Sequence, residues 1–187
     1  MRTVTFGMNI SLDGYCDHTV FKPSAEGSKE VHDYFTRMMD DVDLIVFGRI
    51  MYQLMFPHWS DVAKNQSGTA DENRFAQRLT AIDKVVISRS LDQVEAPARL
   101  VRSNPVEEIR KLKQQPGKKI SIDSVSLLPE LIAAELIDEF HLVIHPVLVG
   151  KGRQLIEGGS LTENVDLKLV DTSVFKSGCV ALHYRKS

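Results

Sequence analysis

The sequence lacks the long apolar runs that mark membrane and secreted proteins. Nowhere in its 187 residues does a run of about 18 apolar residues occur, the length that a helix needs to cross a bilayer. The opening residues, MRTVTFGMNISLDG, hold no apolar segment of the roughly 7–15 residues found in signal peptides. The formal net charge of −2 provides no positive field for nucleic acid or an anionic membrane. We therefore expect a cytoplasmic protein that binds neither nucleic acid nor membranes.

Cysteine is scarce, and histidine shows no metal-binding spacing. The two cysteines, Cys16 and Cys179, lie far apart and form no C-x-x-C pair, which argues against a disulfide framework or a thiolate metal site. His141 and His145 are four residues apart, but on a strand that spacing spans roughly 13 Å, too far for two imidazoles to share an ion. The other histidines show no partner spacing: His18, His32, His58 and His183. We expect no metal site.

Familiar catalytic motifs are missing too. The chain contains no G-x-S-x-G nucleophile elbow, no Walker-type phosphate loop and no G-x-G-x-x-G fingerprint. The H-x-E and P-C-x-x-C signature of zinc deaminases is also absent. Ser11 and Asp13 are neighbours, but a Ser-His-Asp triad is defined by geometry that sequence does not supply. These absences leave a pocket at the strand ends as the place where function is expected.

What the chain does contain is an alternation of strand-like and helix-like segments. Apolar residues make up 43% and charged residues 26%, which is ordinary for one globular domain spanning residues 1–187. The runs TVTFGMNI, DLIVFG and KVVIS are rich in β-formers and bounded by turn residues, and ARLVRS predicts a further short strand. Between the first two runs, apolar residues recur at helical spacing from Val31 to Val42.

Caps and alternation complete the predicted fold. Thr69 and Glu72 have capping-box spacing, and Asn104 followed by Pro105 is a typical cap and first helical residue. The run IDEFHLVIHPVLVG is nearly continuous in apolar residues, as a strand buried on both faces is. The alternating segments VDLKLVDTSVF and CVALHYRK predict an antiparallel pair. Together these segments predict an α/β fold of three layers: a mostly parallel central sheet, helices on both faces and a C-terminal antiparallel hairpin.

The stretch KISIDSVSLLPELI, residues 119–132, predicts a strand that runs into a helix. Such a junction attracts phosphate, because the first helical N–H groups are unpaired and the helix dipole is positive there. Glycine usually lets the backbone approach the anion, but this chain has Asp123 and Ser124. A carboxylate about 4 Å from the phosphate costs about 4 kcal/mol at an effective dielectric near 20, and about 1 kcal/mol or less if it faces solvent. We therefore expect the amides of Ser124, Val125 and Ser126 to bind phosphate only if Asp123 turns away.

Four local strings carry a family resemblance: SLDG (11–14), FGRIMY (47–52), VISRSL (86–91) and LIDEFHLVIHPVLVGKGRQLI (136–156). In order and spacing they resemble the dihydrofolate-reductase-like superfamily. Within it they are most similar to the C-terminal reductase domain of bifunctional riboflavin-biosynthesis deaminase-reductases, and to the free-standing proteins of that type. The resemblance covers nearly the whole chain. It implies that NADPH is the hydride donor, that a heterocyclic substrate faces the nicotinamide and that the protein forms homodimers.

The resemblance assigns cofactor-binding roles to residues at the strand ends. Gly48 and Arg49 match the family's Gly-Arg pair at a helix start, where an arginine can bind the 2′-phosphate. Arg89, which lies between Ser88 and Ser90, is the second candidate for that phosphate. Two arginines near one phosphate would select NADPH over NADH. The other cofactor contacts implied by the resemblance are Ile10, Ile122, Ser124, Val125 and Ser126.

The resemblance also implies that the loop after the first strand lines the nicotinamide and the substrate. Asp13 is the candidate catalytic residue, although it could instead be a turn residue before Gly14. The candidate substrate-binding residues are Asn9, Ser11, Leu12 and Trp59. Trp59 is the only tryptophan and could equally be ordinary packing. We expect further substrate contacts from the variable loop 17–27.

Two departures from the family pattern keep an alternative open. Met51 stands where the family has a threonine whose hydroxyl meets the pyrophosphate, and Asp123-Ser124 replaces Gly-Gly or Gly-Ser. The first interpretation is an NADPH-dependent reductase of a pyrimidine or pterin-like compound, resembling 5-amino-6-(5-phosphoribosylamino)uracil reductase. The second is a non-catalytic or altered-ligand dimer that keeps the fold. A dihydrofolate reductase is a further alternative, but its pterin-facing carboxylate has no clear match among Glu30, His32 and Asp33.

Overall fold

The computed structural model describes residues 1–17, 19, 20, 28–158 and 160–187. Its strands are β1 (Val4–Ser11), β2 (Val42–Gly48), β3 (Asp83–Ile87), β4 (Arg99–Val101), β5 (Lys119–Asp123), β6 (Glu139–His145), β7 (Leu167–Val174) and β8 (Val180–Lys186). Its helices are α1 (Ser28–Met38), the short 3-10 helix η2 (Met39–Asp41), α2 (Arg49–Asn65), α3 (Ala70–Ala81), α4 (Pro105–Gln114) and α5 (Leu128–Ala133). None of the described helices combines the length and apolar character that a membrane crossing needs.

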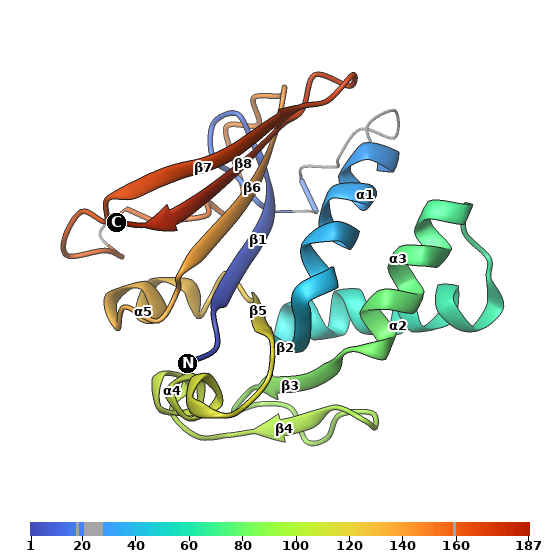
Figure 1. The fold of residues 1–187 in the computed structure, drawn as a ribbon, viewed down its shortest axis with the longest axis vertical. Helices are drawn as coiled ribbons and strands as arrows, with labels where there is room; N and C mark the ends of the chain where they lie inside the picture. The colour runs from blue at the N-terminus through green and yellow to red at the C-terminus, as the bar shows by residue number, and fades with distance from the viewer. Residues whose placement is uncertain (18, 21–27, 159) are drawn as a thin grey trace.

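All eight of these strands form one sheet in the order β4-β3-β2-β5-β1-β6-β8-β7 (Figure 1). The five pairs from β4 to β6 are parallel, so the carboxyl ends of these six neighbouring strands lie at one edge of the sheet. The last two pairs, β6–β8 and β8–β7, are antiparallel. The predicted mostly parallel sheet with a closing hairpin is therefore confirmed. Within the hairpin, β8 pairs with β6, and β7 forms the outer edge of the sheet.

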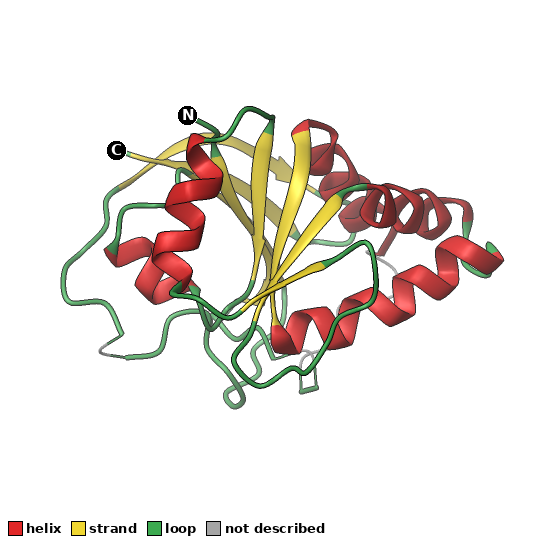
Figure 2. Ribbon diagram, turned by 90° about the horizontal axis from the view of Figure 1, so that it is seen from below, coloured by secondary structure: helices red, strands yellow, loops and turns green. Residues whose placement is uncertain are grey.

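Helices cover both faces of this sheet, as Figure 2 shows. On one face, α4 and α5 pack against the even-numbered residues of β1, including Val4 and Phe6, which are fully buried. On the other face, α2 and α3 pack against Ile45 and Phe47 of β2. The helix α1 covers the middle of that second face, where Val31 contacts a small cluster around β6 and β8. The three-layer arrangement follows from the need of each helix to bury its apolar side.

The face beneath α1 is unusually polar for a buried sheet surface. Its β1 positions are Thr5, Gly7, Asn9 and Ser11, whereas the opposite positions are all apolar. At Gly7 the helix comes so close that an added Cβ would lie 3.0 Å from the Met38 sulfur and 3.2 Å from the Phe35 ring. Glycine is therefore needed there for α1 to sit directly on the sheet.

The local helix signals predicted from sequence are confirmed. The Thr69 hydroxyl accepts a hydrogen bond from the Glu72 amide, and the Glu72 carboxylate accepts one from the Thr69 amide, so the capping box at α3 is complete. The Asn104 side chain accepts from two amides in the first turn of α4, which begins at Pro105. Satisfying these amides at the helix ends stabilises each helix where it begins.

Two boundaries differ from the prediction. The helical pattern expected to reach Val42 ends at Met38, followed by η2, because Val42 is already the first residue of β2. The long apolar run from Ile137 contains only the seven-residue strand β6, which ends before Pro146, a residue that has no N–H to donate to the ladder. Inside the sheet, β6 is buried between β1 and β8, so its apolar residues are covered by the chain itself.

Candidate cofactor and substrate site

A crevice opens where β1 and β5 separate. The two strands pair only from Val4–Phe6 to Ile120–Ile122, whereas β1 stays paired with β6 from Thr5 to Ser11. The second half of β1 therefore has no partner on the β5 side. In open α/β sheets, ligands bind at the carboxyl edge where neighbouring strands part in this way.

The ends of β2 and β5 approach each other at this edge. A Cβ added to Gly48 would overlap the Ser124 hydroxyl oxygen and lie 3.0 Å from the Ser124 Cβ. Only glycine fits at this position, because a side chain would displace the turn after β5. The hydroxyl of Ser124 lies 3.2 Å from that of Ser126, so the two hydroxyls share one small polar surface. Gly48 is also the N-cap residue of α2 and supplies no side-chain cap, which leaves the first amides of α2 available to an anion.

These residues line a cavity of about 190 Å³. Four of the predicted cofactor residues meet there: Gly48, Ser124, Val125 and Ser126. Asp17 and Thr19 belong to the loop 17–27 expected to contact the substrate, Cys16 ends the loop expected to line the nicotinamide, and Met51 stands at the expected pyrophosphate position. Sequence reasoning assigned no role to the remaining lining residues, which are Ile50, Leu54 and Arg153. Ile50 and Leu54 are exposed on the first turns of α2 and give one wall an apolar character.

Arg153 is the cationic side chain among these lining residues. It follows the Gly150–Gly152 segment after β6 and lies close enough to Cys16 to oppose the rise in the thiol pKa that burial causes. The Cys16 amide donates to the Arg153 carbonyl at 2.9 Å, and Tyr15 and Gln154 form an antiparallel bridge. In the sequence, Arg153 falls only within the family string 136–156 and has no assigned role.

Asp13 fastens the two loops at this edge. Its carboxylate accepts hydrogen bonds from the Ser11 hydroxyl at 2.6 Å, the Val149 amide at 3.1 Å and the Gly150 amide at 2.8 Å. These bonds, the one from Ser11 first, lower the pKa of Asp13. A carboxylate held in this way stays ionised at neutral pH, so it is poorly suited to donate a proton and well suited to position the loops.

Asp123 turns away from the cavity. Its Oδ1 accepts a hydrogen bond from the Ser121 hydroxyl at 2.8 Å, two residues back on the same face of β5. The carboxylate is absent from the cavity lining, so the repulsion expected from an acid facing phosphate is avoided. Burial raises the pKa of Asp123 to about 6, and the bond from Ser121 opposes this rise. The first-turn amides expected at Ser124–Ser126 are instead turn amides, since α5 begins only at Leu128.

The two predicted arginines lie beyond adjacent strand ends. Gly48 at the end of β2 pairs with Ile87 at the end of β3. Arg49 comes one residue after Gly48, and Arg89 comes two residues after Ile87. Both side chains are exposed, and that of Arg49 bonds to Gln53 at 3.2 Å. Ser88 is buried and shapes this loop by accepting from the amides of Ser90 and Leu91. Ser90 itself is exposed.

The remaining candidate residues fall into two groups. Ile10 and Ile122 are buried in the core between the sheet and α4–α5, so only their backbones can reach a ligand at the strand ends. Trp59 packs between helices, 4.7 Å from the Phe75 ring and 5.6 Å from the His32 ring, and does not line the cavity. This geometry agrees with the packing role that the sequence left open.

Asn9 lies in the second half of β1, which has no partner on the β5 side, and Leu12 follows the end of that strand. The Asn9 Oδ1 is 3.0 Å from the His145 Nε2, whose ring also contacts the buried Cys179 sulfur at 3.3 Å. This contact fixes the orientation of the Asn9 amide. Leu12 is exposed, and its amide donates to the Val147 carbonyl. Most of the predicted substrate loop 17–27 lies outside the described residues.

Comparison with known proteins identifies the family of the chain. The family model of the RibD C-terminal domain matches residues 2–181. The uncharacterized protein YyaP of Bacillus subtilis strain 168 is 32% identical over 192 residues, which cover 98% of this chain and 94% of that protein. A solved structure from Shewanella sp. PV-4, assigned to riboflavin biosynthesis, aligns with a TM-score of 0.69 at 21% identity and covers 100% and 99% of the two chains.

The superfamily fold is supported by a second solved structure. Dihydrofolate reductase from Enterococcus faecalis, solved with NADP(H), aligns with a TM-score of 0.65 at 12% identity and covers 99% of this chain and 96% of that one. At such identities the likeness establishes the fold, which is dihydrofolate-reductase-like. With the family model matching nearly from end to end, the chain belongs to the RibD C-terminal domain family.

Proposed function

We propose that this protein is an NADPH-dependent reductase of a pyrimidine or pterin-like heterocycle, of the type that reduces 5-amino-6-(5-phosphoribosylamino)uracil in riboflavin biosynthesis. The family to which it belongs is one of reductases, which supports an oxidoreductase activity. The observation that carries the proposal is the contact between Gly48 and Ser124 beside the β1–β5 crevice. There the backbone can approach a dinucleotide without a side chain in the way.

The residues present fit the phosphates of such a cofactor. The uncapped start of α2 and the hydroxyls of Ser124 and Ser126 offer hydrogen-bond donors to a pyrophosphate, and Arg153 offers a positive charge. Because Asp123 is bonded to Ser121, its charge does not face these donors. Met51 contributes no hydroxyl, so Ser124 and Ser126 take over the polar contacts that a threonine would make. When bound, NADPH would supply the hydride to the heterocycle.

Asp123 is the better candidate for the proton source. A pKa of about 6 keeps a useful fraction of the carboxyl protonated near neutral pH, whereas the lowered pKa of Asp13 does not. Asp123 lies at the end of β5, on the polar face beneath α1 and next to the crevice. We assign Asp13 the role of holding the Val149–Gly150 loop against the β1 exit.

The dihydrofolate reductase alternative is weakened by the two carboxylates of α1. Glu30 accepts hydrogen bonds from the amides of Lys176 and Ser177 in the β7–β8 turn. Asp33 forms ion pairs with Arg74 and Lys29. Both acids are thus engaged in joining α1 to its neighbours, and neither faces the crevice as a pterin-binding carboxylate would.

Cofactor titration tests the proposal directly. Following nicotinamide fluorescence, we expect NADPH to bind more tightly than NADH, because Arg49 and Arg89 can both reach a 2′-phosphate. Replacing Arg89 with Ala should remove most of that preference, since a charge-assisted contact contributes on the order of 1.5–3 kcal/mol. Arg110→Ala is the matched control, because Arg110 is exposed on α4, across the sheet.

The outcomes separate the two interpretations of the chain. Equal affinity for NADPH and NADH in the unmodified protein would contradict the assigned roles of Arg49 and Arg89. No binding of either cofactor would favour the non-catalytic or altered-ligand dimer. An equal loss of preference in Arg110→Ala would show that net charge, and not a specific contact, is responsible.

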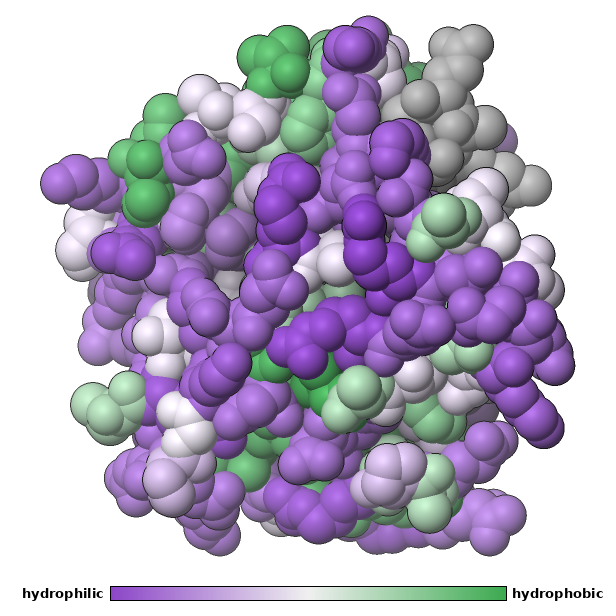
Figure 3. All heavy atoms as spheres, turned by 45° about the vertical axis from the view of Figure 1, so that its right-hand side comes forward, coloured by the Kyte–Doolittle hydropathy of each residue, from purple (hydrophilic) through white to green (hydrophobic). Residues whose placement is uncertain are grey.

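We further propose that the protein is a homodimer. The apolar strand β6 is covered within the chain, so the argument rests on the edge strand β7, which exposes Leu169, Val170 and Val174, the last by 78%. An edge strand with exposed apolar residues is usually covered by a partner. By contrast, the side formed by α1 and α3 is mostly hydrophilic, with small separate hydrophobic groups (Figure 3).

A further inference from the structure

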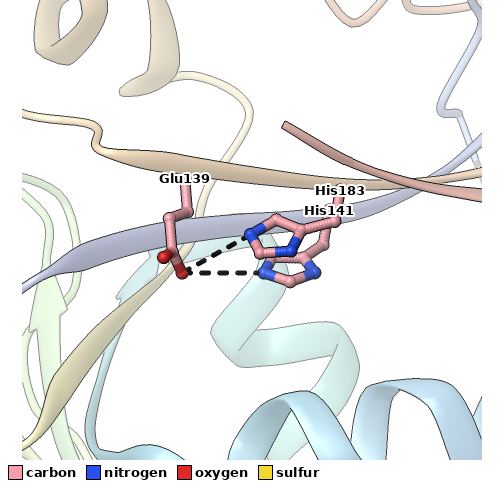
Figure 4. Close-up of side chains that lie close together, drawn as sticks. All are labelled: Glu139, His141 and His183. Carbon is pink, nitrogen blue, oxygen red and sulfur yellow. Dashed lines mark ion pairs between the residues drawn. The ribbon is translucent and has the colours of Figure 1, made fainter. Parts of the chain in front are cut away.

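The polar sheet face beneath α1 holds a second cluster, formed by Glu139, His141 and His183 (Figure 4). Glu139 and His141 are two residues apart on β6 and therefore point to the same face. The antiparallel register of β6 and β8 places His183 directly opposite His141. The two imidazole rings stack with centroids 4.1 Å apart and planes 14° apart. No spacing within one strand predicts this group, because its third member comes from another strand.

We propose that these three side chains bind a divalent transition-metal ion of the zinc class. One ligand atom from each residue lies within 4.8 Å of the other two. The Glu139 Oε2 is 3.7 Å from the His183 Nε2 and 3.9 Å from the His141 Nε2. Tetrahedral zinc with ligands at roughly 2.0–2.2 Å needs donor atoms about 3.4 Å apart, so the Glu139 oxygen needs to approach each imidazole nitrogen by a few tenths of an ångström, and the two nitrogens, within 4.8 Å of each other, need to converge as well. Two nitrogens and one carboxylate oxygen are the donors that such ions take.

The imidazoles need to tilt toward each other to receive the ion. Nearly parallel rings aim their lone pairs side by side, and convergence requires rotation about χ2, a torsion that is soft in histidine. The His183 Nε2 is buried and has no hydrogen-bond partner within the described part of the chain. A buried nitrogen without a partner costs free energy unless a ligand satisfies it. Coordination by an ion would remove that cost.

Neighbouring groups hold the ligands as a second shell does in metal sites. The Tyr34 hydroxyl lies 2.8 Å from the His141 Nδ1, which leaves Nε2 as the coordinating atom. Arg185 donates to the Glu139 Oε1 at 3.1 Å and leaves Oε2 facing the histidines. The Lys119 ammonium also lies 2.8 Å from the Glu139 Oε2, so both oxygens of this carboxylate have a cationic neighbour.

Solvent can reach this cluster from one side. A cavity of about 320 Å³ is lined by both histidines together with Thr5, Tyr34, Arg37, Met38, Asp41, Lys119, Asp171 and Ser173. It provides an entry path and room for a water molecule as the fourth ligand. Among the described residues, none that lines this cavity also lines the cofactor cavity at the strand ends. The two sites can therefore be tested separately.

Lys119 is the natural competitor of the ion. Its Nζ lies 2.8 Å from the Glu139 Oε2, the oxygen assigned to the metal. The Lys119 side chain is 29% exposed, so it can withdraw into solvent when the ion binds. Removing this charge should favour the ion, since a unit positive charge about 4 Å from a divalent ion repels it by about 2 kcal/mol even at the dielectric of water, about thirtyfold in affinity. A merely structural ion-pair network would not respond in this way.

Cobalt and zinc titrations test the site without any enzymatic assay. Protein first treated with a chelator is titrated with Co²⁺ while visible absorption is recorded, and Zn²⁺ is then added in competition. We expect d–d bands of a four-coordinate ion that Zn²⁺ abolishes. His183→Ala should remove them, and His58→Ala, which deletes an exposed histidine of α2 outside the cluster, should leave them unchanged. Lys119→Met should bind Co²⁺ about five- to thirtyfold more tightly, the lower figure if Lys119 withdraws into solvent when the ion binds. Circular dichroism confirms that each variant is folded.

Several results would overturn the proposal. Absence of Co²⁺ and Zn²⁺ binding at millimolar concentration in the unmodified protein excludes the site. Binding that survives in folded His183→Ala, or that is lost equally in His58→Ala, places the ion elsewhere. Weaker binding by folded Lys119→Met would show that Lys119 supports the site and does not compete with the ion.

Discussion

Replacing Asp123 with Asn should stabilise the protein at alkaline pH and leave it nearly unchanged in acid. Burial raises the pKa of this carboxyl from 3.8 to about 6 in the folded state. A carboxyl whose pKa is raised on folding costs nothing while it is protonated in both states, below about pH 4. The cost grows as the pH rises and is complete above about pH 6. A shift of about two units corresponds to about 3 kcal/mol as an upper limit.

Asn is the suitable replacement because it keeps the size of Asp123 and the oxygen that accepts from Ser121. Urea unfolding of both proteins at pH 4.5 and pH 8 would measure the free energy of unfolding. The variant should gain about 1–3 kcal/mol at pH 8 and about a third of that gain at pH 4.5, which lies less than one unit above the unfolded pKa. Asp92→Asn is the control, because Asp92 is an exposed loop residue. A gain of the same size at both pH values, or a loss at pH 8, would refute the reasoning that burying the ionised Asp123 carboxylate destabilises the folded protein.

Two further expectations concern close packing and assembly. Gly48→Ala should lower the free energy of unfolding by about 1–3 kcal/mol and weaken NADPH binding, because the new Cβ overlaps Ser124. Adding Ser124→Gly should restore part of the lost stability. Thermal unfolding of Gly48→Ala at the temperature of the unmodified protein would contradict this. Light scattering should give about twice the 21.0 kDa of one chain, and Val174→Lys on the edge strand β7 should favour the monomer; a mass near 21.0 kDa for the unmodified protein at micromolar concentration would rule out the dimer.

Local signals predicted the elements of the fold well, since each depends on residues close in the chain. The capping box of Thr69 and Glu72 fixes where α3 begins, whatever the helix packs against. The predicted helix up to Val42 was too long, because Val42 is apolar and fits the helical period as well as the strand that it actually opens. Periodicity alone cannot decide between the two when one apolar residue suits both.

The sequence predicted which residues lie at the candidate site only because the family resemblance implies the order of the strands in the sheet. Gly48 and Ser124 follow parallel strands, so both were expected at one edge, but their direct contact depends on β2 and β5 being neighbours. The orientation of Asp123 depends on the Ser121 hydroxyl two residues earlier, a bond that alternation allows and does not require. Arg153 reaches the cavity because the loops after β1 and β6 pair with each other, which no local pattern shows.

The polar face beneath α1 explains why two separate sites can share one sheet. Burying polar side chains is costly unless each is paired, so a chain that needed only packing would repeat on this face the apolar residues of the opposite one. Toward the carboxyl edge, Asn9 lies in the half of β1 that has no β5 partner and Asp123 ends β5, so both are beside the crevice proposed for hydride transfer. In the first half of the strands, Glu139 and His141 meet His183 around a cavity of their own. The bonds that satisfy Asn9 and Asp123 come from His145 and Ser121, while those of the second cluster come from Tyr34, Lys119 and Arg185. Since the two networks share no bond among these, loss of a metal ligand should leave cofactor affinity intact, and loss of a cofactor contact should leave metal affinity intact.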